Sequence, residues 1–135
     1  LNSEAADYKL AGSAANARLS ELHWPLDLVW LGMGADGHTA SIFPGPDLDE
    51  ALAPAKDVRA IGVRPDPMPP EAPVDRVTLT VPAIVEARTT MFVINGAEKQ
   101  AVLEKAIEDG KKSNCPVGHV FDALTVPVDI YCLSS

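Results

Sequence analysis

The stretch VWLGMGADGHTASIFPG constrains the fold more than any other part of this chain. It begins within a short apolar run, LDLVWL at residues 26–31, which predicts a strand covered on both faces in a parallel or mixed sheet. Gly32, Gly34 and Gly37 follow at once. Ligands of such sheets bind where strand ends open onto loops, so a functional loop is predicted over residues 32–38.

The rest of the chain alternates between the two kinds of regular structure. Helices are expected over residues 8–22, 80–87 and 96–110, and strands over residues 58–63, 76–80 and 90–95. Thr80 is placed to begin the second helix, and Gly110 to end the third. Residues 64–73 hold too many prolines for either structure and predict a loop. This order indicates one α/β domain over residues 1–135 with a largely parallel sheet.

Composition excludes several classes of protein. The 135 residues are 47% hydrophobic, enough for one soluble domain with a core. A net charge of −8 argues against nucleic-acid partners and anionic membrane surfaces. No apolar run reaches the roughly 20 residues that span a bilayer, and no signal peptide is recognisable, so a cytoplasmic location is expected. Cys115 and Cys132 read as free thiols, and the start at Leu1 suggests part of a longer polypeptide.

The glycine spacing G-x-G-x-x-G raises the alternative of a dinucleotide site. Such a site needs a long helix directly after the third glycine. The segment Pro44-Gly45-Pro46 ends any helix that starts at Gly37 within about two turns. Asp57 has the separation of a ribose-binding acid but precedes its strand instead of ending it. The cofactor interpretation is therefore disfavoured, and no cofactor is expected.

The same glycines can instead bring the backbone close to a ligand and direct Asp36 and His38 at it. A neutral histidine can accept a proton from water, and Asp36 is close enough in sequence to orient the ring or a substrate hydroxyl. This predicts Asp36 and His38 as catalytic residues. The alternative is that His38 only begins a helix and bonds to the backbone.

Two cations are candidates for substrate binding. Lys99 is predicted in the first turn of its helix, where a phosphate meets both an ammonium group and free N–H donors, although it can also be an ordinary surface lysine. Arg76 follows the proline loop and can reach substrate or pair with Asp75 or another carboxylate. No metal site is expected, because the histidines are isolated in the sequence. Trp24 and Trp30 are predicted to be packing residues.

Two long segments resemble the 6-phosphogluconolactonases: DLVWLGMGADGHTASIFPG, and RVTLTVPAIVEARTTMFVINGAEKQAVL with its G-x-x-K turn. The resemblance implies a Rossmann-like three-layer α/β/α fold, of which this chain is an incomplete, C-terminal portion. It implies hydrolysis of 6-phospho-D-glucono-1,5-lactone without metal or cofactor. By motif position His38 is the general base, Asp36 with the Gly34 and Gly37 backbone shapes the site, and Lys99 faces the phosphate.

The related glucosamine-6-phosphate deaminases are the alternative enzyme class. Their comparable segment carries a glutamate five residues after the histidine, where this chain has Phe43. The lactonases' S-G-G-S-T-P loop and D-E-R segment are absent here, so a non-catalytic sugar-phosphate-binding module also stays open. The last block, CPVGHVFDALTVPVDIYCL, matches loosely, and His119 is expected in a loop. The expected partner is a small phosphorylated sugar lactone, and the oligomeric state is left open.

Overall fold

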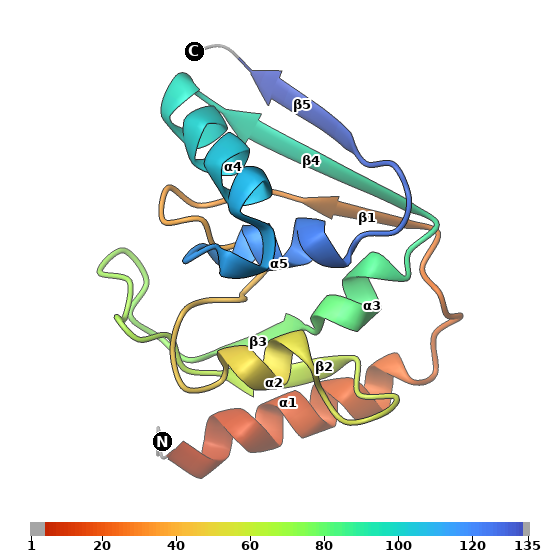
Figure 1. Cartoon of the computed structure of the whole chain (residues 1–135). Coiled ribbons are helices and arrows are strands. Elements are labelled where there is room, and N and C mark those ends of the chain that lie inside the picture. Colours follow the sequence, from red (N-terminus) through yellow and green to blue (C-terminus); the bar gives the residue numbers. More distant parts are fainter. Residues whose placement is uncertain (1–4, 134–135) are drawn as a thin grey trace.

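The computed structural model describes residues 5–133 of the chain (Figure 1). Its helices are α1 (Ala5–Leu19), α2 (Leu48–Leu52), α3 (Val81–Val85), α4 (Ala97–Asp109) and α5 (Pro116–Ala123), with a 3₁₀ turn, η1 (Gly110–Lys112), after α4. Its strands are β1 (Leu28–Leu31), β2 (Ala60–Val63), β3 (Arg76–Leu79), β4 (Thr89–Asn95) and β5 (Asp129–Leu133). The alternating order is confirmed, while α2, α5 and β5 have no counterpart among the predicted elements.

The main sheet is parallel and has the strand order β1-β4-β5. Leu31 of β1 is in register with Phe92 of β4, and Ile94 of β4 with Cys132 of β5. Parallel neighbours need a long crossover, and α4, η1 and α5 lie in the connection between β4 and β5. The predicted α/β class with a parallel sheet is confirmed.

A second, two-stranded sheet departs from the single sheet expected. β2 and β3 pair antiparallel, with Ala60 opposite Leu79 and Val63 opposite Arg76. The chain between them is the proline-dense segment, which has no helix and therefore brings β3 back beside β2 directly. The prediction of a loop over residues 64–73 is confirmed.

One hydrophobic core joins the two sheets to the helices. It includes Val29, Leu31, Phe92 and Ile94 from the main sheet, Ile61 and Val63 from β2, and Ile84, Leu103, Val117 and Val120 from α3, α4 and α5. Figure 1 shows α4 and α5 on the same side of the main sheet. The glycine loop is thereby held between the end of β1 and the start of α5, which gives the candidate site a rigid base.

The other face of the main sheet is exposed, at Leu28, Trp30, Tyr131 and Leu133. Trp30 is 67% exposed, so its prediction as a packing residue is wrong for the described chain, as is the expectation that its strand is covered on both faces. Successive side chains of a strand point to opposite faces, and the buried ones here are Val29 and Leu31.

Helix α1 packs differently from the amphipathic helix expected over residues 8–22. It ends at Leu19, and Leu10 is 65% exposed. Its contact with β2 is made where Gly12 lies against Gly62 with no space for a Cβ atom. The helix is therefore placed by a close backbone approach instead of an apolar stripe.

Several smaller predictions are also tested by the structure. Thr80 does precede α3, but its hydroxyl donates to the carbonyl of Val58 instead of capping the helix. Gly110 ends α4 with a φ of 57°, as expected. Trp24 is half-buried, its Nε1–H donates to the Leu19 carbonyl, and the Arg59 guanidinium carbon lies 4.6 Å from the centre of its ring. Within residues 5–133, no helix combines the length and apolar character needed to cross a membrane.

Candidate active site

The glycine loop after β1 is a tight turn held by its own backbone. The Gly34 N–H donates to the His38 carbonyl and the Gly37 N–H to the Gly34 carbonyl, each at 2.9 Å. The Thr39 hydroxyl donates to the Gly32 carbonyl at 2.8 Å, which ties the end of the loop back to the end of β1. These bonds fix the direction in which residues 36–38 leave the sheet.

The side chains of His38 and Asp36, both in this loop, form a hydrogen-bonded pair. Nδ1 of His38 lies 2.5 Å from Oδ1 of Asp36, and the His38 backbone N–H donates to the same oxygen at 3.1 Å. A Cβ atom on Gly34 would collide with the His38 ring and lie 2.9 Å from Asp36 Oδ1. Glycine is needed at residue 34 because the pair lies directly on its backbone.

The charge on Asp36 determines which nitrogen of His38 is available. Partial burial acts to raise the pKa of Asp36, but hydrogen bonds from the ring and backbone of His38 outweigh it and hold that pKa below its usual value. An ionised carboxylate can only accept, so Nδ1 carries the hydrogen. In the neutral ring Nε2 is then the nitrogen that can accept a proton.

Asp36 and His38 line a pocket of about 590 Å³. One wall is the glycine loop and the segment that follows it, and the other is the proline-dense loop. The lining residues are Gly34, Ala35, Asp36, His38, Ala40, Ser41, Phe43, Pro67, Met68, Pro69, Pro70, Glu71, Ala72 and Arg76. The pocket is therefore largely apolar, with few polar groups and one cation, as is usual for a small-molecule site.

Arg76 supplies the positive charge of the pocket. Its Nη1 and Nη2 atoms donate to the carbonyls of Val74 and Ala72, both at 2.8 Å, which leaves further N–H groups on the guanidinium. Asp75 does not pair with Arg76, because it accepts two bonds from Arg64 at 2.6 and 2.7 Å. Arg76 therefore lines the pocket and does not pair with Asp75, and its binding of substrate stays a prediction.

Gly37 and Lys99 lie outside the lining of this pocket. Gly37 has a φ of 85°, and a Cβ atom on it would lie 2.5 Å from Cβ of Cys115. Its carbonyl accepts from the Val117 N–H, so it anchors the loop to α5. Lys99 lies in the first turn of α4, directly after β4, which is the parallel neighbour of β1.

Two contributions to the pocket have no counterpart among the predicted site residues. Phe43 is 6% exposed, lines the pocket and stacks on the His38 ring, with centroids 4.2 Å apart. The proline-dense segment forms a wall, and its position next to Arg76 in the sequence was the available signal. His119 lies in α5 and its Nε2 is 3.0 Å from the Ser113 carbonyl, so the expectation of a loop histidine is wrong.

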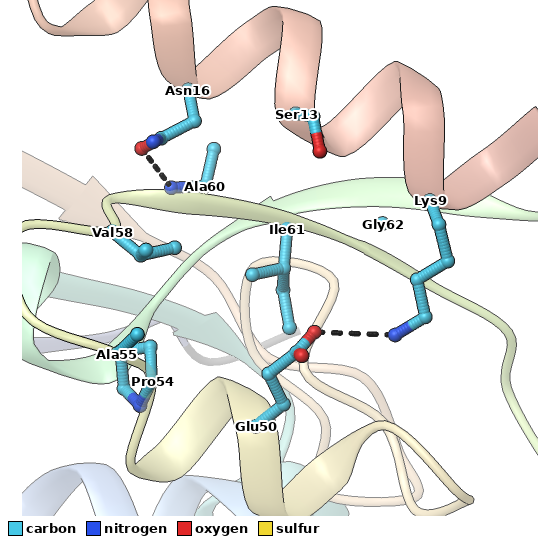
Figure 2. Close-up of a pocket in the computed structure, with 10 residues that line it drawn as sticks. All are labelled: Lys9, Ser13, Asn16, Glu50, Pro54, Ala55, Val58, Ala60, Ile61 and Gly62. Atoms are coloured by element: carbon cyan, nitrogen blue, oxygen red, sulfur yellow. Dashed lines mark hydrogen bonds and ion pairs between the residues drawn. The ribbon is translucent and has the colours of Figure 1, made fainter.

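A second hollow, of about 280 Å³, lies between α1, α2 and β2 (Figure 2). Lys9 and Glu50 pair across it at 3.2 Å, and the Asn16 side chain accepts from the backbone N–H of Ala60. The Lys9, Glu50 and Asn16 side chains thus bond to one another or to the backbone. Among residues 5–133 there is also no group of three or more His, Cys, Asp or Glu side chains placed to hold a metal ion.

Comparison with known proteins gives one consistent result. Residues 1–126 match the family model described as glucosamine-6-phosphate isomerases/6-phosphogluconolactonase. A 6-phosphogluconolactonase of Mesorhizobium japonicum is 38% identical over 129 residues, which are 95% of this chain and 52% of the relative. The human 6-phosphogluconolactonase is 39% identical over 94 residues, 70% of this chain and 34% of that protein.

Solved structures agree with the sequence comparison. The crystal structure of a 6-phosphogluconolactonase from Shewanella baltica matches with a TM-score of 0.81 and 31% identity, over 95% of this chain and 52% of that one. The 6-phosphogluconolactonase from Trypanosoma brucei matches with a TM-score of 0.75 and 28% identity, over 98% and 53%. The chain spans about half the length of each of these structures. On the match over residues 1–126, it belongs to the glucosamine-6-phosphate isomerase/6-phosphogluconolactonase family.

Proposed function

We propose that this chain carries the catalytic pair of an enzyme that hydrolyses 6-phospho-D-glucono-1,5-lactone to 6-phospho-D-gluconate, a step of the oxidative pentose phosphate pathway. The observation that carries the proposal is the 2.5 Å pair of His38 and Asp36 at the mouth of a pocket that Arg76 also lines. The 6-phosphogluconolactonases among its relatives support the choice of substrate. A cytoplasmic location stays a prediction.

In this mechanism His38 is the general base. Asp36 holds hydrogen on Nδ1, so Nε2 takes a proton from water as the water oxygen bonds to the lactone carbonyl carbon. Negative charge develops on the carbonyl oxygen. When the intermediate collapses, the bond to the ring oxygen breaks and His38 returns the proton to that oxygen. No covalent enzyme intermediate is required.

The cations bind substrate in this proposal. Arg76 has free N–H groups at the pocket and can bind either the phosphate or the developing oxyanion. Lys99 is proposed as a second phosphate ligand, since its turn follows the strand next to β1. Gly34 and Gly37 contribute by shape, because their N–H groups are already engaged within the loop.

The test is lactone hydrolysis by the complete natural polypeptide that contains these residues. Freshly generated lactone is supplied, the product is oxidised in a coupled assay, and spontaneous hydrolysis is subtracted. His38→Ala is expected to lower kcat at least about a hundredfold. His23→Ala, an exposed histidine outside the pocket, is the matched control and is expected to leave kcat unchanged. Near-normal turnover by His38→Ala would exclude His38 as the base.

The isomerase branch of the family is separated by a second substrate. Residue 43 is a phenylalanine packed on His38, where the deaminase pattern places an acid. We therefore expect no ammonia release from glucosamine 6-phosphate. Ammonia release would place the protein with the deaminases. Absence of turnover on both substrates would favour the non-catalytic sugar-phosphate-binding module.

A further inference from the structure

Phe43 contacts both of the groups to which the proposed function assigns chemistry. Its ring stacks on the His38 imidazole with centroids 4.2 Å apart and planes inclined by 22°. The Arg76 guanidinium carbon lies 4.6 Å from the centre of the same ring. We propose that Phe43 is a positioning residue, which holds the base and the substrate-binding cation in fixed places. The inference rests on the proposed function for its effect on rate, but its structural part can be measured without turnover.

The segment that carries Phe43 is itself tied down on several sides. Before it, the Ser41 N–H donates to the Thr78 hydroxyl of β3 at 3.0 Å. After it, the Pro44 carbonyl accepts from the Asp66 N–H of the proline-dense loop at 3.0 Å. Its neighbour Ile42 is fully buried in the core. The backbone on either side of Phe43 is bonded to β3 and to the proline-dense loop, and Ile42 anchors it in the core. The Phe43 ring therefore has a fixed position against which partly exposed side chains can pack.

His38 needs such a reference because its other contact fixes only part of its geometry. The bond from Nδ1 to Asp36 holds one atom of the ring, and the Asp36 side chain is 51% exposed. The hydrogen bond restrains the ring only at its Nδ1 edge and leaves both ring faces without support from Asp36. Stacking on the flat face of Phe43 fixes the plane of the imidazole and with it the direction of Nε2. The general base is then aimed at one place in the pocket.

Arg76 is held in a related way. Two of its nitrogens donate to the carbonyls of Ala72 and Val74, which flank Pro73 at the end of the proline-dense loop. The face of the Phe43 ring attracts the guanidinium through a cation–π interaction, which uses none of its N–H groups as hydrogen-bond donors. Phe43 therefore orients the cation and leaves the remaining N–H groups for an anionic substrate. A carboxylate at residue 43 would instead occupy those donors.

The first measurement is the NMR spectrum of the His38 ring nitrogens in the complete natural polypeptide, in the wild type and in Phe43→Leu and Phe43→Tyr. We expect one set of signals with hydrogen on Nδ1 in the wild type and in Phe43→Tyr, which keeps a flat ring. Phe43→Leu is expected to show broadened or tautomer-averaged His38 signals. Unchanged His38 signals in Phe43→Leu would overturn the proposal, whether or not the lactone is a substrate.

The second measurement is steady-state hydrolysis of the lactone. Phe43→Leu is expected to lower kcat about tenfold and to raise KM severalfold, whereas Phe43→Tyr stays within about threefold of wild type. Phe121→Leu is the matched control, because Phe121 packs at a tilt on Phe92, with ring centroids 4.7 Å apart, and does not line the pocket. It is expected to lower stability without changing either constant. Equal kinetic effects of Phe43→Leu and Phe121→Leu would contradict a positioning role.

Double-mutant cycles separate positioning from general loss of structure. If Phe43 acts through His38, Phe43→Leu no longer lowers kcat when it is combined with His38→Ala. If it acts through Arg76, its effect on KM disappears in combination with Arg76→Met. Full additivity in both pairs would overturn the proposal. If the wild type does not hydrolyse the lactone, the proposed function fails, and the NMR comparison still decides whether Phe43 positions His38.

Discussion

Gly12 of α1 and Gly62 of β2 lie backbone to backbone, without room for a Cβ atom on either residue. A Cβ on Gly12 would collide with the backbone nitrogen of Gly62, and one on Gly62 with the carbonyl of Tyr8. We predict that Gly12→Ala lowers the free energy of unfolding by about 1–3 kcal/mol, as overpacking does. This outcome opposes intrinsic preference, since alanine favours a helix over glycine by about 1 kcal/mol.

The control for this prediction is Gly32→Ala. The nearest atom to a Cβ on Gly32 would be the Val93 carbonyl oxygen at 3.9 Å, an ordinary contact. Urea denaturation of both variants measures the difference. Gly12→Ala as stable as the wild type would show that the helix and strand are not held this closely in solution.

Asp47 gives the fold an acid-sensitive contact between α1 and the start of the proline-dense loop. Its carboxylate accepts from Lys9 Nζ at 2.5 Å and from the Arg64 N–H at 2.8 Å. Partial burial acts to raise the pKa of Asp47, but these hydrogen bonds outweigh it and lower that pKa. Because the pKa of Asp47 is lower in the folded state, its carboxylate stabilises the fold at pH values above the unfolded-state pKa of about 3.9. This stabilisation is lost as the pH falls through the folded-state pKa.

We predict that Asp47→Asn costs about 1–3 kcal/mol at neutral pH, the usual cost of losing hydrogen bonds to a charged group. The gap in melting temperature between wild type and variant should be widest near pH 6–7 and shrink below about pH 4. Asp49→Asn removes an exposed carboxylate nearby and is the control. A gap that does not change with pH would contradict the role assigned to the Asp47 charge.

Arg64 and Asp75 close the base of the loop that forms one wall of the pocket. Both oxygens of Asp75 accept from Arg64, and the hydrogen bond from Arg64 holds the pKa of Asp75 below its usual value. We predict that Asp75→Asn loosens the wall and raises the KM for lactone roughly fivefold, equivalent to about 1 kcal/mol, with little change in kcat. Asp109→Asn breaks the Lys105 pair on the surface of α4 and serves as the control. Equal KM values for the two variants would mean that the pair does not shape the pocket.

The parts of the fold that side-chain patterns encode could be predicted from the sequence. The apolar runs that became β1 and β4 and the helix ended by Gly110 are such parts. The packing of α1 could not, because glycines make the contact and hydrophobic periodicity reports only side chains. The exposure of Trp30 was equally hidden, since an apolar run does not say which faces of its strand are covered.

The candidate site, like the fold, could be predicted from the sequence only in part. The pairing of Asp36 with His38 is local, two residues apart, and the glycines around it point to a tight turn. The position of Arg76 depends on Arg64 taking Asp75, a choice between two arginines that spacing does not reveal. The stacking of Phe43 on His38 depends on how the chain turns after Thr39, which only the folded backbone determines.

Asp36→Asn tests whether the carboxylate acts by fixing the hydrogen of His38. The asparagine amide can donate to Nδ1, which moves the ring hydrogen to Nε2 and removes the proton acceptor from the pocket. We predict a fall in kcat of about a hundredfold with KM nearly unchanged, measured by lactone hydrolysis from pH 5 to pH 8. Glu71→Gln removes another carboxylate from the same pocket without touching His38, and it is expected to leave kcat within about threefold of wild type. If both variants lower kcat equally, the net charge of the pocket controls the rate; if only Asp36→Asn does, the hydrogen bond to Nδ1 determines which nitrogen of His38 can act as the base.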